Sequence, residues 1–247
     1  LQCFTDGSSL MAMPPVQDHK RAYEGDVGPN TGGMGSYSSA DHLLPFLPQQ
    51  VLDQAEVICQ AIVDALRREG CPYVGAFYGQ FMYTPRGPVV IEINARFGDP
   101  EAMNVLPLLK TPYVEVLKAM VEGTLGGMEL EFAPKATVCK YIVPKGYGVS
   151  SLADVPLGID EGVVSRSGAI MFYASVNERE GRVFTTSSRS VAFVGCGPTI
   201  AEAEAKAEAA LSSVSGEYDA RHDIGKPETI ERKVNHMRQV LSGRDMD

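Results

Sequence analysis

The chain has 247 residues, of which 44% are hydrophobic, and a formal net charge of −9 with a pI near 5.0. This length allows one or two domains with real cores, and the acidic balance argues against general nucleic-acid binding through a basic surface. No apolar run approaches the roughly 20 residues that span a bilayer, so we expect no membrane partner. The five cysteines form no C-x-x-C pair, which favours a cytoplasmic location.

The N-terminal residues predict a β-hairpin, with strands at 1–6 and 10–13 around a turn at 6–9. Because the chain starts inside a strand and without Met, we expect it to be a fragment of a longer protein. The segment 13–37 then shows neither helical nor strand periodicity. A loop of this length is either functional or disordered. Its glycines would let backbone N–H groups approach an anion, although it matches no P-loop or dinucleotide fingerprint.

A long amphipathic helix is predicted next, from Pro48 to Gly70, because apolar residues recur there at helical spacing. We expect this helix to pack on a sheet. Two strands follow at 73–83 and 89–94, joined by the turn sequence TPRG at 84–87, and predict an antiparallel hairpin.

A second helix is predicted after residue 110. Thr111 is the candidate N-cap and Pro112 the first helical residue. Glycines near residue 125 end the helix. We expect Val114, Leu117 and Val121 to line its buried side.

Composition changes near residue 132, which predicts two domains, 1–131 and 132–247. The second is predicted to be small and β-rich, with short strands at 135–143, 168–175, 182–186 and 191–195. Thr199 and Glu202 form a capping box for an Ala-rich helix, and a last short helix is expected at 230–241.

The stretch from Val89 to Glu101 carries the clearest chemistry. Apolar and polar residues alternate in it, which places Glu92 and Asn94 on one face, and Arg96 falls on that face if the strand continues. Carboxylate and amide oxygens suit Mg²⁺, which completes its shell with water and phosphate. Any half-exposed strand shows the same alternation, so periodicity alone leaves a purely structural interpretation open.

Three segments together resemble the glycinamide ribonucleotide synthetases, or phosphoribosylamine–glycine ligases, of the ATP-grasp superfamily. They are QDHKRAYEGDVGPNTGGMG at 17–35, IEINARFGDPE at 91–101 and RHDIG at 221–225. The first two are long and specific, and in order and spacing the three cover nearly the whole chain. The resemblance implies an α+β fold. An ATP-grasp second lobe, an antiparallel sheet with packed helices, would precede a small β-rich C-terminal domain with helices.

The resemblance also implies an activity. Such enzymes ligate glycine to 5-phosphoribosylamine in de novo purine biosynthesis, through an enzyme-bound glycyl phosphate, and release ADP and phosphate. ATP would be the co-substrate and Mg²⁺ or Mn²⁺ the metal. The chain would be the C-terminal part of the enzyme, and the N-terminal domains that it lacks would be its partners.

Site residues follow from the matched motifs. Glu92 and Asn94 match the family's metal ligands, Arg96 would neutralise charge on the transferring phosphoryl group beside the nucleotide, and Asp99 would lie near the amine substrates. The glycine and phosphoribosylamine pocket would be shaped by residues of the 17–35 segment, namely Asp18, Lys20, Arg21, Asn30, Thr31, Gly32 and Gly33. We pair Lys20 and Arg21 with the substrate's phosphate.

Departures from the family pattern keep alternatives open. Gln80 stands where many ATP-grasp enzymes have a metal-binding Glu, and Ser187 and Ser188 replace a glycine pair before Arg189. The alternatives are another ATP-grasp carboxylate–amine ligase, such as a purine carboxylase, or a non-catalytic binding fragment. The RHDIG segment is interpreted either as a binding element or as a structural turn beside a helix.

Overall fold

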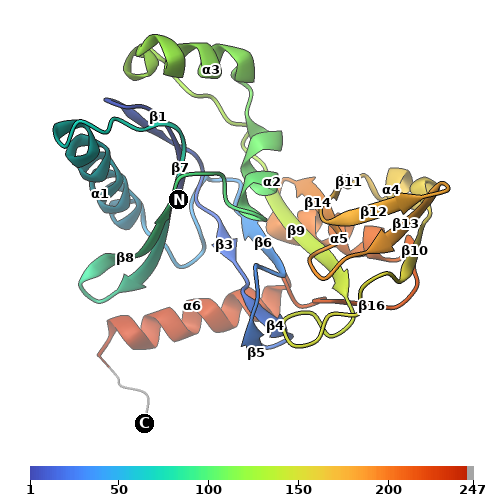
Figure 1. Ribbon diagram of the computed structural model, residues 1–247. Coiled ribbons are helices and arrows are strands. Elements are labelled where there is room, and N and C mark those ends of the chain that lie inside the picture. Colours follow the sequence, from blue (N-terminus) through green and yellow to red (C-terminus); the bar gives the residue numbers. More distant parts are fainter. Residues whose placement is uncertain (244–247) are drawn as a thin grey trace. The chain divides into compact units, whose positions relative to one another are not determined.

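The computed structural model describes residues 1–243, which fall into two compact units (Figure 1). The first unit contains Leu1–Val16, Asp41–Pro134 and the chain from Glu231 onward, and the second contains Gln17–Ala40 and Lys135–Ile230. The units therefore interleave along the chain, and the domain boundary near residue 132 stays a prediction. Within the described residues, no helix combines the length and apolar character needed to cross a bilayer.

The first unit is built on an antiparallel sheet in the order β2-β1-β7-β8. Its strands are β1 (Gln2–Asp6), β2 (Leu10–Ala12), β7 (Val74–Thr84) and β8 (Gly87–Asn94). β1 and β2 form the predicted N-terminal hairpin, and β7 and β8 form the predicted second one. Both predictions are confirmed.

Helix α1 (Gln49–Arg68) covers one face of this sheet, as predicted (Figure 1). Pro48 is its N-cap. Cys59 and Val63 lie four residues apart, so they share a helix face, and both pack in one cluster with Phe77 of β7. This apolar stripe gives the helix its buried side.

The remaining helices of the first unit lie after the second hairpin. They are α2 (Glu101–Val105), the 3₁₀ turns η1 (Leu106–Leu108) and η2 (Leu125–Gly127), α3 (Tyr113–Glu122), and most of α6 (Pro227–Leu241). The predicted start of α3 is wrong by one residue. Pro112 is the N-cap, and the Thr111 hydroxyl accepts a hydrogen bond from the Glu131 N–H instead, at 2.8 Å.

The predicted buried face of α3 is also wrong. The expected residues are exposed, at 66% for Val114, 38% for Leu117 and 83% for Val121. The buried residues are Val116, Ala119 and Met120, which pack in one core cluster with side chains of β1 and η2. Apolar residues occupy both faces of this helix, so periodicity could not select the one that meets the sheet.

The second unit contains a larger sheet in the order β11-β14-β9-β6-β3, with β16 also paired to β9. Its strands are β3 (Gln17–Asp18), β6 (Gly35–Ser38), β9 (Ala136–Pro144), β11 (Ile170–Tyr173), β14 (Val191–Gly197) and β16 (Tyr218–Ala220). Strand β9 is buried along its whole length. The strands predicted at 135–143, 168–175 and 191–195 are thereby confirmed.

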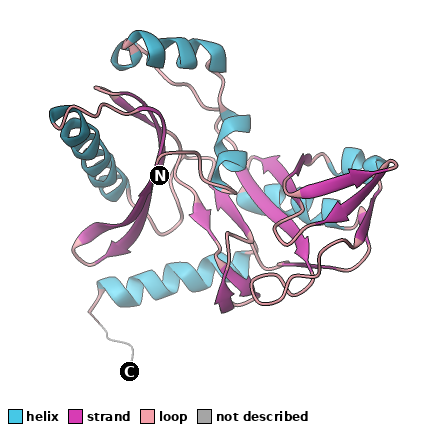
Figure 2. Ribbon diagram, in the orientation of Figure 1, coloured by secondary structure: helices cyan, strands magenta, loops and turns pink. Residues whose placement is uncertain are grey.

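Helix α5 (Ile200–Leu211) packs on β9 and β14 (Figure 2). The Thr199 hydroxyl accepts from the Glu202 N–H, as the predicted N-cap. The approach is close, because a Cβ on Gly195 would lie 1.9 Å from the Ala203 carbonyl oxygen. The small residues of α5 and the glycine of β14 therefore allow helix and sheet to meet.

A second, smaller sheet of this unit has the order β12-β13-β10-β15. Its strands are β10 (Pro156–Ile159), β12 (Val176–Arg179), β13 (Arg182–Thr185) and β15 (Val214–Ser215), and α4 (Glu161–Ser167) follows β10. The strand predicted at 182–186 is confirmed.

The segment predicted as a loop at 13–37 contains four short strands, which corrects both that prediction and the alternative of disorder. Besides β3 and β6 it contains the pair β4 (Arg21–Tyr23) and β5 (Val27–Asn30). His19, Met34 and Tyr37 are buried. These strands are only two to four residues long, and β6 pairs with β9 a hundred residues away, so local periodicity carries no signal for them.

Candidate functional site

The polar row predicted at the end of β8 forms in the structure. The Asn94 side-chain amide donates to Glu92 Oε1 at 3.2 Å, and Arg96 Nη2 donates to Asn94 Oδ1 at 3.2 Å. Strand β8 ends at Asn94, yet Arg96 still reaches back to it. Glu92 and Arg96 are exposed and Asn94 is half-buried. A carboxylate, an amide and a guanidinium thus lie side by side at a solvent-accessible strand end.

Strand register shows which face of the sheet carries this row. Glu92 lies opposite Gln80 and Asn94 opposite Tyr78, and paired residues share a face. Phe77 points to the other face, where it packs with α1. Glu92 and Asn94 therefore face away from α1.

The donor set is sparse for a metal. Within residues 1–243, no group of three or more His, Cys, Asp or Glu side chains is placed to hold an ion. The available oxygens are the Glu92 carboxylate and the Asn94 amide oxygen, which has a second lone pair besides the one that accepts from Arg96. Mg²⁺ binds proteins through one or two such oxygens and keeps water and substrate phosphate as its other ligands. The residues fit a divalent cation that arrives with a nucleotide.

The turn after this row is held by buried polar groups that sequence reasoning missed. The Gly98 N–H donates to Gln2 Oε1 at 2.7 Å, and the Tyr78 hydroxyl donates to Glu101 Oε1 at 2.6 Å. Glu101 is only 4% exposed, and its Oε2 would lie 2.5 Å from a Cβ on Gly98. Glycine is required there, and exposed Asp99 is presented by a fixed turn. Sequence periodicity gives no indication that the glutamate of the GDPE motif is buried.

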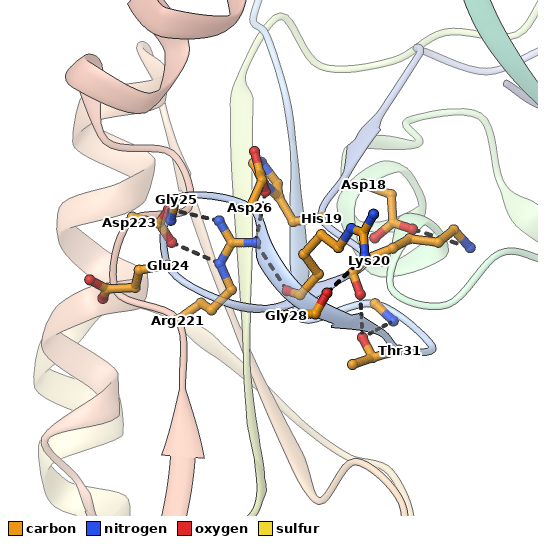
Figure 3. Close-up of polar contacts among 12 residues, drawn as sticks. Asp18, His19, Lys20, Glu24, Gly25, Asp26, Gly28, Thr31, Arg221 and Asp223 are labelled. Carbon is orange, nitrogen blue, oxygen red and sulfur yellow. Dashed lines mark hydrogen bonds and ion pairs between the residues drawn. The ribbon is translucent and has the colours of Figure 1, made fainter. Parts of the chain in front are cut away.

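In the second unit, the 17–35 segment gathers the predicted substrate-binding residues (Figure 3). Lys20 Nζ lies 3.4 Å from Asp18 Oδ2, and Arg21 Nη1 donates to the Gly28 carbonyl at 2.8 Å. Lys20 is half-buried and Arg21 exposed. Both cations therefore have contacts within the segment and still reach solvent.

The tip of the segment is shaped by its own backbone. The Thr31 N–H and hydroxyl both donate to the Lys20 carbonyl, at 2.7 and 2.9 Å, and the Gly33 N–H donates to the Thr31 hydroxyl at 3.1 Å. Asn30, which pairs with Arg21 across β4 and β5, is exposed. Thr31 is thus the residue that fixes the turn from Lys20 to the glycines.

Arg189 and Tyr147 complete the tip, and sequence reasoning assigned neither. Arg189 Nη1 donates to the carbonyls of Gly32 and Gly33, at 2.9 and 3.3 Å, and its guanidinium stacks 4.8 Å from the Tyr141 ring centre. The Gly32 N–H donates to the Tyr147 hydroxyl at 3.4 Å. Arg189 lies more than 150 residues away in sequence, so its role appears only in the folded chain.

Each group of predicted residues is thus brought together within its own unit. The row at 92–99 belongs to the first unit, and the cluster at 18–33 belongs to the second.

Comparison with protein families matches two models. Residues 1–102 match the phosphoribosylglycinamide synthetase ATP-grasp (A) domain, and residues 137–227 match the phosphoribosylglycinamide synthetase C domain. Together they account for most of the chain.

Curated relatives agree. The phosphoribosylamine–glycine ligase of Methanocella arvoryzae is 51% identical over 96% of this chain and 54% of its own length, and that of Methanococcoides burtonii is 52% identical over 97% and 55%. The chain spans about half the length of these curated relatives.

Solved structures show the same fold. The phosphoribosylamine–glycine ligase of Thermotoga maritima matches with a TM-score of 0.78 at 27% identity, over 90% of this chain and 54% of that one. The biotin carboxylase domain of Hydrogenobacter thermophilus 2-oxoglutarate carboxylase matches with a TM-score of 0.59 at 14% identity, over 96% and 48%, which extends to fold alone. From its family models, its relatives and its fold, the chain belongs to the phosphoribosylglycinamide synthetase family of ATP-grasp proteins.

Proposed function

We propose that this chain is the C-terminal part of an enzyme that uses ATP to ligate glycine to 5-phosphoribosylamine. The products would be glycinamide ribonucleotide, ADP and phosphate, and the reaction would pass through glycyl phosphate. The remaining, N-terminal part of the same enzyme would be its partner, because the curated relatives are about twice as long.

The observation that carries this proposal is the identity of about 50% to phosphoribosylamine–glycine ligases along almost the whole chain, together with the polar row at 92–96. A decayed, non-catalytic relative would have no reason to keep a carboxylate, an amide and a guanidinium in contact at an exposed strand end. Replacing such exposed groups costs the protein little stability, so stability alone would not retain them.

The first step requires charge neutralisation. The glycine carboxylate attacks the γ-phosphorus of ATP, and ADP leaves, so negative charge gathers on the transferring group. Arg96 would offset that charge, and its hydrogen bonds to Asn94 and to the Phe97 carbonyl would hold the guanidinium in place before the reaction. Glu92 and Asn94 would hold Mg²⁺ or Mn²⁺, and the ion would supply positive charge that offsets the negative charge of the nucleotide.

The second step needs an oriented amine. The amino group of phosphoribosylamine would attack the acyl carbon of glycyl phosphate, and phosphate would leave with the electrons of the broken C–O bond. The attacking nitrogen would release one proton to solvent as the amide forms. Asp99, exposed on the turn held by Gln2 and Glu101, would accept a hydrogen bond from an amine substrate. Lys20 and Arg21 would bind the 5-phosphate, and Asn30 to Gly33 would border the pocket.

The test is ADP release by this chain combined with the N-terminal portion of the enzyme. ATP, Mg²⁺, glycine and freshly generated phosphoribosylamine are supplied, and each is omitted in turn. We expect ADP release that requires both amines. Release that continues without glycine would indicate a different ATP-grasp ligase, and no release under any condition would indicate a non-catalytic protein.

A further inference from the structure

The RHDIG segment, residues 221–225, contacts the substrate segment 17–35 through four consecutive residues. Its arginine, Arg221, is fully buried and donates from Nη1 to Asp26 Oδ1 at 2.8 Å and to the Arg21 carbonyl at 3.1 Å (Figure 3). Asp26 Oδ1 also lies 3.2 Å from Nδ1 of buried His19. One guanidinium thus connects β4 with the turn that follows it.

The next three residues extend this contact. The His222 N–H donates to Glu24 Oε1 at 3.1 Å. The Asp223 carboxylate accepts from the Gly25 N–H at 2.9 Å. The Ile224 side chain is buried, and its Cδ1 would lie 3.0 Å from a Cβ on Gly35. The whole β4–β5 turn and the start of β6 are therefore held from one side.

Arg221 is held in turn by Asp223. Its Nε and Nη2 donate to the two carboxylate oxygens at 2.8 and 2.7 Å, a bidentate pair that fixes the guanidinium plane. Burial alone would raise the pKa of Asp223. The hydrogen bonds from Arg221 and from the Gly25 N–H outweigh burial, so the pKa lies below its ordinary value. The pair is ionised at neutral pH.

The segment is anchored behind by Lys140 of β9. Lys140 is fully buried and donates from Nζ to the His222 carbonyl at 2.8 Å and to Glu204 Oε1 of α5 at 2.6 Å. Gly225 has φ of 81°, and a Cβ there would lie 3.0 Å from the Val138 side chain. Strand β9 and helix α5 therefore anchor residues 221–225, which in turn contact the 17–35 segment.

We propose that Arg221 is a positioning residue for phosphoribosylamine binding, and this inference rests on the proposed function. The side-chain hydrogen bonds from Arg221 to the 17–35 segment go to Asp26 and to the Arg21 carbonyl. It holds Asp26 and the Arg21 backbone, and thereby sets where Lys20, Arg21 and the tip meet the phosphorylated amine. Residues 221–225 thereby fix the conformation of the 17–35 segment.

The first measurement is hydrogen exchange of the isolated chain, because it needs no ligand and no activity. Arg221→Lys keeps the charge but loses the bidentate fork. We expect exchange of the amides in 19–35 to rise about 10- to 100-fold, while the amides of β14 stay unchanged. Asp223→Asn should do the same, and it keeps the test available should Arg221→Lys fail to fold.

Two matched controls separate positioning from general loss of stability. Val164→Ala removes core volume in the same unit, in a cluster that contains no residue of 17–35. Arg179→Ala removes the exposed ion pair with Asp154. Neither should raise exchange in 19–35 selectively. Unchanged exchange there in both Arg221→Lys and Asp223→Asn would overturn the proposal, as would an equal rise in β14.

The second measurement is steady-state kinetics of the reconstituted enzyme. We expect Arg221→Lys to raise the KM for phosphoribosylamine at least about tenfold and to leave the KM for ATP within about twofold. A purely structural role would lower the amount of active enzyme, so kcat would fall with both KM values unchanged, and this result would overturn the proposal. If the wild type itself shows no ligase activity, the proposed function fails, and the exchange result then decides only whether Arg221 orders the 17–35 segment.

Discussion

At the scale of single residues, Glu92 illustrates how a side chain of the candidate site differs from a core side chain in its contribution to stability. It is exposed, and its carboxylate accepts a hydrogen bond from the Asn94 side-chain amide. We therefore expect Glu92→Gln to leave the free energy of unfolding within about 0.5 kcal/mol and to lower turnover of the reconstituted enzyme by about 100-fold or more. Glu122→Gln, at another exposed position, is the control. Near-normal turnover at saturating Mg²⁺ would remove Glu92 from the mechanism.

Asp223 makes a prediction about pH at the same scale. Its pKa in the folded chain lies below the ordinary value of 3.8, so the unfolded chain binds this proton more tightly. The stabilisation is therefore complete above pH 3.8 and is lost as pH falls through the lower, folded pKa. Asp223→Asn removes hydrogen bonds to a charged partner, which are worth about 1.5–3 kcal/mol.

The measurement is urea unfolding of the wild type and of Asp223→Asn between pH 7 and pH 2.5. We expect the gap in unfolding free energy between wild type and Asp223→Asn to be largest near pH 7 and to narrow below pH 3.8. Asp154→Asn, which breaks an exposed pair, should show a gap of at most about 1 kcal/mol throughout. A gap for Asp223→Asn that stays constant down to pH 2.5 would contradict the assignment.

At the scale of elements, α3 shows that apolar residues of one helix can differ widely in burial. Val116 is fully buried in the core of the first unit, and Val114, two residues earlier, is 66% exposed. The same chemical change therefore has different consequences. We expect Val116→Ala to cost about 2 kcal/mol and Val114→Ala to be neutral or slightly stabilising, because alanine has the higher helix propensity. Denaturant unfolding of the two variants measures this, and equal losses would reverse the assigned face.

At the scale of the whole molecule, the prediction concerns completeness. The chain carries the polar row at 92–96 and the 17–35 segment but spans about half the length of its curated relatives. We expect the chain alone to release no ADP with ATP, Mg²⁺, glycine and phosphoribosylamine, and addition of the N-terminal portion to restore release. A Glu92→Gln chain in the same mixture is the control. Release by the chain alone that requires both amines would show that the rest of the enzyme is dispensable.

Local signals in the sequence were enough for several elements. Helix α1, the two hairpins of the first unit and the capped helix α5 depend on periodicity, turn residues and a capping box, which act over a few residues. Glu92 and Asn94 belong to the same class, because strand periodicity alone places alternate side chains on one face. Arg96 lies beyond the end of β8 and reaches back to Asn94.

Tertiary structure decided the rest, because those features depend on partners distant in sequence. The buried face of α3 was selected by the apolar side chains of β1 and η2. Strand β6 pairs with β9 and β3 pairs with β6, and Arg221 is bound to Asp26, nearly 200 residues earlier. By itself the sequence determined helix α1, the two hairpins of the first unit, helix α5 and the chemistry of β8. Only long-range packing decided which segments contact residues 17–35, since a buried ion pair such as Arg221–Asp26 is defined by its three-dimensional neighbours.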